Sequence, residues 1–375
     1  MKVGVPRETF PGEKRVALSP DGIKKITEAG AEVVIEKGAG RSAFFFDDTY
    51  QKNGCKIAVD AAAVYRDSDI ILKIGKPEDS EVAMLREGQT LIALLQPLVN
   101  RDLMKKLAQK KVTAFSMDAV PRIARAQRMD ALSSQSSIAG YKAVLIGASK
   151  VGKYLPMMVT AAATMAPSKV LVVGAGVAGL QAIATAHRLG AQVEAFDVRP
   201  AVKEQVQSLG GTFLELEGPA EEAEDARGYA KEMSADHQKR ETEMLKKHAI
   251  AADIVITTAL VPGKRAPVLI TRDIVEAMKP GSVIVDLAAE TGGNCELTQP
   301  GEDTVVNGVI ITPCLNLASD MAMTASLLYS RNISGLLLLM LKEGKLNLDF
   351  EDQIIKDSIV THQGELMGIY KDQIK

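Results

Sequence analysis

The chain has 375 residues, with 45 Lys and Arg against 47 Asp and Glu and therefore a net charge of −2. This length allows two domains that each bury a hydrophobic core, and the balanced charge excludes a general electrostatic attraction to nucleic acid or anionic lipid. The 3 cysteines and 4 histidines are scattered along the chain, which argues against a disulfide framework and a metal site and suits a reducing cytoplasm.

Strand-like and helical segments alternate through the first third of the chain. The expected helices include 20–29 and 101–110, and the expected strands are 2–5, 32–36, 69–74, 90–95 and 112–116. Because parallel strands need long crossover connections, this alternation predicts a doubly wound parallel sheet. The first strand begins at residue 2, so no signal peptide is expected.

Residues 124–165 are rich in Ala, Met, Gln and Ser and are expected to be helical, including the linker between two domains. Within them, Gly147–Lys153 matches the GxxxxGK pattern of a phosphate-binding loop. Tyr154, however, stands where such a loop needs a Ser or Thr hydroxyl for Mg²⁺, and the flanking residues have helical spacing. The sequence therefore argues against an NTPase.

The strand–helix alternation begins again at residue 169. Further strands are expected at 169–173, 191–196, 211–216, 252–258 and 282–287. A helical tail from residue 319 should pack back on the first domain, and its apolar run 333–341 is too short to span a bilayer and is expected to be a buried helix. The fold class is therefore α/β, with two Rossmann-like, doubly wound parallel-sheet domains joined by linker helices. The expected limits are 1–133 with 317–375 for the first domain and 134–316 for the second.

The second domain begins with a glycine-rich turn between a strand and a helix. Gly174 allows a tight turn, Gly176 lets the backbone approach a pyrophosphate, and Gly179 lets the helix pack on the strand. The first helical amides and the positive end of the helix dipole favour phosphate. Asp197 ends the second strand, where it can accept hydrogen bonds from both adenosine ribose hydroxyls and would repel a 2′-phosphate. The turn therefore predicts a site that binds NAD(H) in preference to NADP(H).

Residues 217–248 interrupt this alternation with many charges and few large apolar side chains. Such a connection is usually a solvated surface excursion, which we favour here, and sometimes an active-site lid. As a lid, the segment around Tyr229 would be mobile when empty and ordered when NAD(H) is bound.

Polar side chains recur at three-residue spacing just before the linker. On a helix, Gln127, Asp130 and Ser133 would share one face, and Arg122 precedes them in a turn after Pro121. Together they offer donors and acceptors suited to a carboxamide, the polar group of nicotinamide. By periodicity alone, a solvated polar helix face is the favoured interpretation.

The segment from Arg122 to Tyr141 resembles the signature of the NAD(H)-binding component of proton-translocating nicotinamide nucleotide transhydrogenase. The similarity covers nearly the whole chain, and its other matches are Arg15–Pro20, the glycine turn through Val206, Gly228–Met233, Ile256–Lys264 and Gly292–Cys295. Arg128 departs from the serine that is usual in the family, which puts the docking of this loop in question.

The resemblance implies which residues bind the nucleotide. The nicotinamide end would be held by Arg122, Gln127, Asp130 and Ser133. The glycine turn would be joined at the adenosine end by Val177, Asp197, Val198 and Arg199, and further cofactor contacts would come from Gly228, Tyr229, Ala259 and Leu260.

The resemblance also implies an enzyme subunit that works with partners. A hydride would pass directly between NAD(H) on this chain and NADP(H) on a partner beta subunit, coupled to proton translocation by membrane-spanning subunits. The chain would be a homodimer without direct membrane insertion of its own. It would be cytoplasmic, and peripheral at the inner face of the plasma membrane through its partner subunits.

Alanine dehydrogenase shares the N-terminal pattern and the glycine turn, and is the main alternative. Its members carry a catalytic histidine where this chain has Gln96, and a lysine where it has Gly75. Gln96 cannot transfer a proton near pH 7, whereas hydride exchange between two nicotinamides needs positioning and no general acid or base. A non-catalytic NAD-sensing module is a third possibility, for which the polar set from Arg122 to Ser133 would be unneeded.

Overall fold

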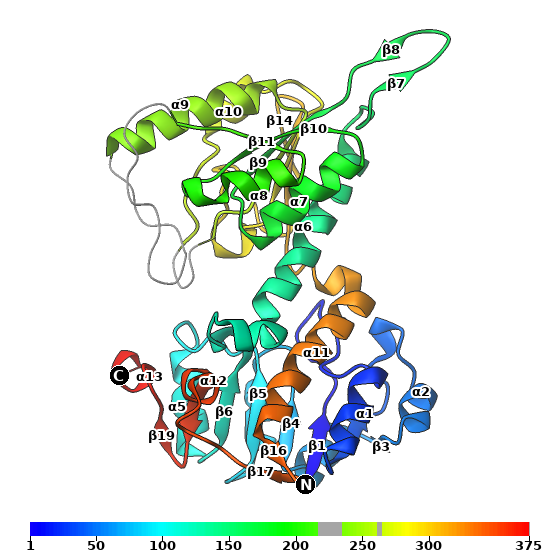
Figure 1. The fold of residues 1–375 in the computed structure, drawn as a ribbon, viewed down its shortest axis with the longest axis vertical. Coiled ribbons are helices and arrows are strands. Elements are labelled where there is room, and N and C mark those ends of the chain that lie inside the picture. Colours follow the sequence, from blue (N-terminus) through cyan, green and yellow to red (C-terminus); the bar gives the residue numbers. More distant parts are fainter. Residues whose placement is uncertain (217–234, 261–264, 375) are drawn as a thin grey trace. The chain divides into compact units, whose positions relative to one another are not determined.

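In the computed structural model, the described residues are 1–216, 235–260 and 265–374. They form two compact units (Figure 1). Unit 1 is Met1–Gln135 with Ala318–Lys375, and unit 2 is Ser136–Leu317. These limits lie close to the domain limits expected from the sequence.

The described residues of unit 1 form an eight-stranded sheet in the order β19-β18-β6-β5-β4-β1-β2-β3. The strands from β1 to β6 pair in parallel, whereas β18 and β19 are antiparallel at one edge. The strands are β1 (Lys2–Val5), β2 (Glu32–Glu36), β3 (Lys56–Ala58), β4 (Ile70–Leu72), β5 (Thr90–Ala93), β6 (Thr113–Ser116), β18 (Ile359–His362) and β19 (Glu365–Leu366). The α-helices are α1 (Pro20–Glu28), α2 (Asp47–Lys52), α3 (Ala61–Asp67), α4 (Asp79–Met84), α5 (Arg101–Gln109), α11 (Ala322–Met340), α12 (Gln353–Ser358) and α13 (Tyr370–Gln373).

The C-terminal tail packs in unit 1 as expected, but it is not helical throughout. The apolar run 333–341 does form a buried helical segment of α11, in which Ile333, Leu336 and Leu337 are fully buried. The short hairpin β16 (Leu341–Lys342) and β17 (Lys345–Leu346) follows, and then β18 and β19 extend the sheet. Gln363 and Gly364 both have positive φ, which suits a two-residue hairpin turn between β18 and β19. Of the helices described, none combines the length and apolar character needed to cross a membrane.

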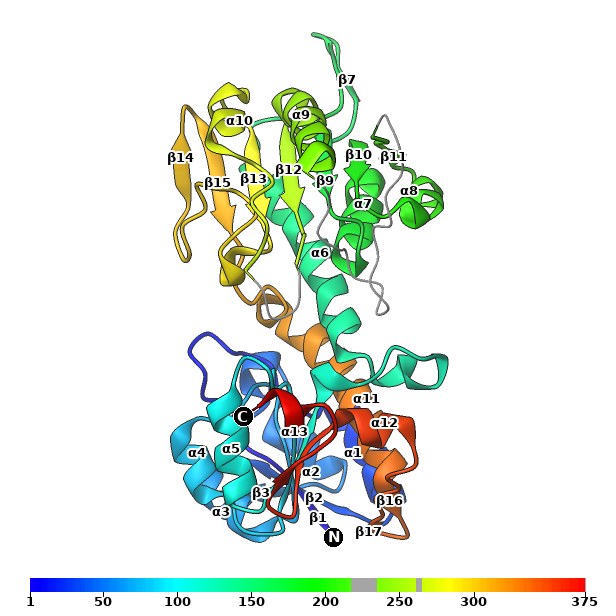
Figure 2. The same ribbon diagram turned by 90° about the vertical axis from the view of Figure 1, so that its left-hand side faces the viewer.

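The described residues of unit 2 form a seven-stranded sheet in the order β11-β10-β9-β12-β13-β15-β14 (Figure 2). All neighbouring strands are parallel except β14, which pairs antiparallel with β15 at the edge. The strands are β9 (Lys169–Val173), β10 (Gln192–Phe196), β11 (Thr212–Phe213), β12 (Ile254–Thr257), β13 (Val283–Asp286), β14 (Thr304–Val306) and β15 (Val309–Pro313). The α-helices lying wholly in this unit are α7 (Val177–Arg188), α8 (Lys203–Ser208), α9 (Ala235–Ala251) and α10 (Arg272–Ala277).

Helices cover both faces of this sheet, because its strands bury side chains on both sides. In β9, Val170 and Val172 belong to one hydrophobic cluster, whereas Leu171 and Val173 belong to another. Such runs without polar alternation are typical of parallel sheets covered on both faces. The burial explains why the strand before the glycine turn is an uninterrupted apolar run.

The segment 124–165, expected to be helical, contains three different structures. It begins with the 3₁₀ helix η3 (Ala124–Met129), continues as α6 (Ala131–Lys150) and ends in the hairpin β7 (Met158–Val159) and β8 (Thr164–Met165). The helical expectation is therefore wrong after Lys150, where Pro156 lies in the chain that leads to the hairpin. Gly147 lies inside α6, so the GxxxxGK match begins in a helix and is not a phosphate loop.

Candidate functional site

The glycine turn lies at the carboxyl end of β9, where the chain enters α7. Gly174 has φ +98°, which favours glycine, and a Cβ there would lie 2.5 Å from Thr258 Oγ1. A Cβ on Gly179 would lie 1.8 Å from the carbonyl oxygen of Gly174, so only glycine allows α7 to pack this closely. A Cβ on Gly176 would meet no atom within 4 Å. The turn is therefore closed by two glycines and borders open space at the third.

Asp197 follows β10 directly, and its carboxylate is engaged on both oxygens. Its Oδ2 accepts hydrogen bonds from the amide of Ala175 at 2.7 Å and from Arg199 Nη2 at 2.8 Å. Its Oδ1 accepts from the Arg199 amide at 2.9 Å and from Arg199 Nε at 2.8 Å. Because the carboxylate is only 9% exposed, this pairing compensates for its desolvation. Ribose hydroxyls could bind Asp197 only after the Arg199 side chain moves, which the sequence did not predict.

The sheet order places this turn where the direction of strand connection reverses. From β9 the chain runs to one side through β10 and β11, and β12 then lies on the other side of β9. Ligands of open α/β sheets bind at the carboxyl edge beside such a reversal. Ala259 and Leu260 follow β12 at this edge, and the Leu260 side chain is 49% exposed.

Asn294 fixes the backbone at the end of β12, and sequence reasoning did not single it out. Its Oδ1 accepts from the Ala259 amide at 3.0 Å, and its Nδ2 donates to the Ala259 carbonyl at 2.9 Å and to the Pro267 carbonyl at 2.8 Å. Asn294 is fully buried, so these bonds hold the main chain in a single arrangement. Its place in the Gly292–Cys295 match was the available signal.

A second carboxyl group lies within electrostatic range of Asp197. Glu241 on α9 is 8% exposed. Burial, and then the charge of Asp197, raise the pKa of Glu241 to about 7. The charge beside the ribose-binding carboxylate therefore changes across the neutral pH range.

These features fit the phosphates and ribose of a dinucleotide. The first intrahelical bond of α7 joins the Leu180 amide to the Gly176 carbonyl at 2.8 Å, so the amides before it are donors without a partner inside the helix. They lie beside the open space at Gly176, and Val177 is 40% exposed there. The half-buried Val198 lies between Asp197 and Arg199.

Two expected cofactor contacts, Gly228 and Tyr229, lie outside the described residues, as does the centre of the expected solvated excursion or lid. The excursion was expected to reach residue 248, but α9 begins at Ala235. Leu245 and Ala249 are fully buried one helical turn apart, which explains why this segment is a packed helix despite its charges.

The expected nicotinamide-binding residues lie in unit 1 and do not share one continuous helix. Gln127 belongs to η3, Asp130 has non-helical angles of φ −72° and ψ 86°, and Ser133 lies in the first turn of α6. Asp130 caps α6, because its Oδ1 accepts from the Ser133 amide at 2.8 Å and its Oδ2 from Ser133 Oγ at 2.6 Å. The expected shared helix face is therefore wrong. Arg122 and Gln127 are exposed, whereas Asp130 and Ser133 are half-buried.

Neighbouring elements of unit 1 fix this loop in place. Arg125 forms a bidentate ion pair with Asp352, with both N–O distances 2.7 Å. Gln135 accepts from Arg15 Nη1 at 2.8 Å and donates to the Ala325 carbonyl of α11 at 3.2 Å. The loop is therefore preorganised by contacts from the N-terminal segment and from the C-terminal tail.

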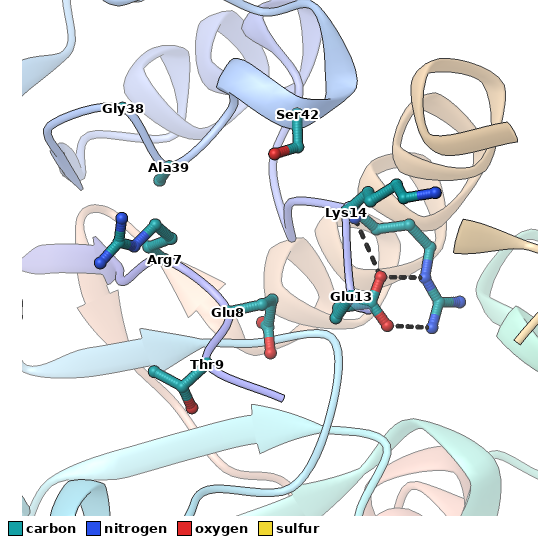
Figure 3. Close-up of a pocket in the computed structure, with 9 residues that line it drawn as sticks. Arg7, Glu8, Thr9, Glu13, Lys14, Gly38, Ala39 and Ser42 are labelled. Carbon is teal, nitrogen blue, oxygen red and sulfur yellow. Dashed lines mark hydrogen bonds and ion pairs between the residues drawn. The ribbon is translucent and has the colours of Figure 1, made fainter. Parts of the chain in front are cut away.

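A recess of ≈ 360 Å³ opens beside the N-terminal loop of unit 1 (Figure 3). Its cations are already paired: Arg15 binds both oxygens of Glu13, at 2.8 and 2.6 Å, and Lys14 binds Asp320 at 3.0 Å. The recess is lined by Arg7, Glu8, Thr9, Glu13, Lys14, Arg15, Gly38, Ala39 and Ser42.

The residues nearest to an alanine-dehydrogenase arrangement are not available for that chemistry. Gln96 is exposed with φ +45°, and its amide and that of Leu95 donate to Asp118 Oδ1 at 3.2 and 2.9 Å. Lys73 is fully buried between Glu81 at 2.7 Å and Glu8 at 3.2 Å. Neither residue supplies a proton donor or an open cation for a keto acid.

Models of two protein families match the chain. "Alanine dehydrogenase/PNT, N-terminal domain" matches residues 4–139, and "Alanine dehydrogenase/PNT, C-terminal domain" matches residues 143–368.

Similar proteins match over most or nearly all of their length. The chain is 47% identical to the first portion of the NAD(P) transhydrogenase alpha subunit of Rhodospirillum rubrum, a separate chain, with 98% of each chain covered. The alanine dehydrogenase of Halomonas elongata is 31% identical, over 87% of this chain and 84% of that protein. The crystal structure of a transhydrogenase from Sinorhizobium meliloti superposes with a TM-score of 0.85 at 42% identity, with 98% of each chain covered.

Proposed function

Because this chain belongs to the alanine dehydrogenase/PNT family, and its transhydrogenase relatives are markedly more similar to it than its alanine dehydrogenase relatives, we propose that it is the NAD(H)-binding subunit of a proton-translocating NAD(P) transhydrogenase. In this function, a hydride passes directly between NAD(H) on this chain and NADP(H) on a partner subunit. Membrane-spanning subunits couple that exchange to proton translocation.

The glycine turn is the observation that carries this proposal. Two of its glycines cannot take a Cβ without a clash, the third borders open space, and Asp197 anchors the turn through the Ala175 amide. This geometry lies at the carboxyl edge of a parallel sheet, beside the reversal between β9 and β12. It supports binding of the pyrophosphate at the α7 N-terminus and of the adenosine ribose at Asp197.

The loop in unit 1 then has a positioning role. When bound, NAD(H) supplies the nicotinamide carbon that gives up or accepts the hydride. Arg122 and Gln127 are exposed donors, and Asp130 and Ser133 hold the loop where η3 ends and α6 begins. Together they would fix the carboxamide and hence the ring, because hydride exchange depends on near-attack geometry. No proton is moved by any of these residues.

The same reasoning supports a partner for the second nucleotide. The chain shows one convincing glycine fingerprint, so NADP(H) is assigned to a separate beta subunit. We further propose a homodimer that lies on the cytoplasmic side of the plasma membrane, attached through its membrane-spanning partners. Alanine dehydrogenase activity is disfavoured by the surroundings of Gln96 and Lys73.

Two assays with the purified chain separate these functions. NADH is incubated with NADP⁺ analogues, with and without an added NADP(H)-binding subunit, and separately with pyruvate and ammonia. We expect hydride transfer only when the partner subunit is present, and no oxidation of NADH by pyruvate and ammonia. Oxidation of NADH in the second assay would favour the dehydrogenase, and NADH binding without transfer in either assay would favour a sensor.

A further inference from the structure

Asn332 of α11 joins the two ends of the nicotinamide-binding loop. Its Nδ2 donates to the Arg128 carbonyl at 3.0 Å, and its Oδ1 accepts from Ser134 Oγ at 2.7 Å. Arg128 lies in η3 and Ser134 lies in α6, so a single amide bridges the chain on either side of Asp130. The contact to residue 128 is to the main chain, so it does not depend on the arginine side chain at this position.

The bridge is buried at a close approach of α11 to the loop. Asn332 is 7% exposed, and Gly335 lies three residues further along α11, on the same side. A Cβ on Gly335 would lie 3.2 Å from Met129 Cγ and 3.7 Å from the Arg128 carbonyl oxygen. Water has little access to this contact, so breaking the bridge would leave buried polar groups without partners.

The bridge acts at the point where the loop can bend. Asp130 interrupts the helical backbone between η3 and α6, and its own side chain faces forward to Ser133. The amide of Asn332 is the contact that ties the end of η3 back to α6 across this break. Gln127 is one residue from the tethered carbonyl, so its place relative to Asp130 depends on the bridge.

We propose that Asn332 is a positioning residue for hydride transfer, an inference that rests on the proposed function. It touches neither nucleotide and moves no proton. It keeps Gln127 and Asp130 in the arrangement that orients the nicotinamide ring, and a ring displaced by about 1 Å transfers hydride on the order of a hundredfold more slowly.

Asn332→Asp tests this role through a pH profile. The introduced carboxyl group keeps the shape and the acceptor for Ser134 Oγ–H, but donates to the Arg128 carbonyl only when it is protonated. We expect the single-turnover rate with the partner subunit to fall on the order of tenfold to a hundredfold at pH 8, and to recover as the pH falls. NADH affinity, measured by titration, should change by less than about threefold, because the glycine turn is untouched.

Controls separate the bridge from general effects of charge or folding. Arg128, Asp130 and Arg331 are the neighbouring ionisable groups in sequence, and they are present in both proteins. Asn53→Asp introduces the same charge change at an exposed site, where Nδ2 donates to the Thr49 carbonyl at 2.8 Å, and should keep the wild-type profile. Asn332→Ala removes both bonds without a titratable group and should be slow at every pH. Circular dichroism checks that each variant is folded.

The possible results are distinct. A wild-type rate in Asn332→Ala, or slow transfer by folded Asn332→Asp without recovery in acid, would overturn the inference and leave the proposed function intact. Absence of transfer by the wild-type protein with its partner would overturn the proposed function, and this inference with it.

Discussion

Replacing Asp197 with alanine should weaken NADH binding and narrow the preference of the protein for NADH over NADPH. In the structure, Asp197 accepts from the Ala175 amide and from Arg199, and we propose that ribose hydroxyls replace the Arg199 side chain when the nucleotide binds. Two hydrogen bonds to a charged acceptor would then be lost in the variant. Their loss costs on the order of 1–3 kcal/mol, or roughly 5- to 150-fold in affinity for NADH.

NADPH should respond differently, because its 2′-phosphate is repelled by the same carboxylate. Two unit charges about 5 Å apart repel by about 3 kcal/mol at an effective dielectric constant of 20. Arg199 offsets part of this repulsion, since it pairs with both Asp197 oxygens. Arg199→Ala should therefore increase the ratio of the NADPH and NADH dissociation constants, whereas Asp197→Ala should decrease it. Contacts to the adenine cancel in this ratio, because both nucleotides share them.

Calorimetric titration of each protein with NADH and with NADPH measures these ratios. Asp197→Asn is the matched control for folding, because its amide oxygen can still accept from the Ala175 amide. Equal affinity of the wild-type protein for both nucleotides would refute the assignment of Asp197. A ratio that moves in the same direction in Asp197→Ala and Arg199→Ala would refute the opposed roles of the two side chains.

Three further results are expected. Gln127→Ala should slow hydride transfer with the partner on the order of a hundredfold while weakening NADH binding far less; an unchanged rate would show that Gln127 does not position the ring. Gly179→Ala should lower the melting temperature strongly, since its Cβ would lie 1.8 Å from the Gly174 carbonyl oxygen, whereas Gly176→Ala should keep the melting temperature and weaken NADH binding; loss of stability in both would contradict this division. The pKa of Glu241 is raised from 4.5 to about 7, so the folded protein binds more protons than the unfolded chain between these values and loses stability as the pH rises through them. Glu241→Gln should therefore be more stable than wild type at pH 8, by at most on the order of 3 kcal/mol, with no gain near pH 4.5; equal denaturation midpoints at both pH values would contradict the raised pKa.

Much of the fold follows from local patterns. The strands of both parallel sheets that carry the site are continuous apolar runs, and the glycine spacing at 174–179 has few conformations that fit it. The edge strands were missed because their side chains alternate little and their partners are distant in sequence: β18 pairs with β6, more than two hundred residues earlier. The register of such strands depends on tertiary packing rather than on local sequence.

The candidate site shows the same division. The residue types at Gly174, Asp197 and Asp130 pointed to a turn, an anchoring acid and a polar loop, but not to their partners. Periodicity at Gln127, Asp130 and Ser133 suggested one helix, whereas Asp130 ends one helix and caps the next. Arg199, Asn294 and Asn332 act through contacts with main-chain or side-chain groups that only the folded chain brings near. Amides that bind backbone leave no periodic signal in a sequence.

Transfer of deuterium tests direct hydride exchange most directly. NADH labelled with deuterium at the transferred position of C4 is mixed with this chain, its NADP(H)-binding partner and NADP⁺, and the NADPH formed is analysed by mass spectrometry. Direct exchange between the two nicotinamides predicts that the deuterium is recovered quantitatively in NADPH, and that no labelled NADPH forms when either subunit is omitted. Loss of the label to water, or transfer by this chain without its partner, would contradict direct hydride transfer between nucleotides on two subunits.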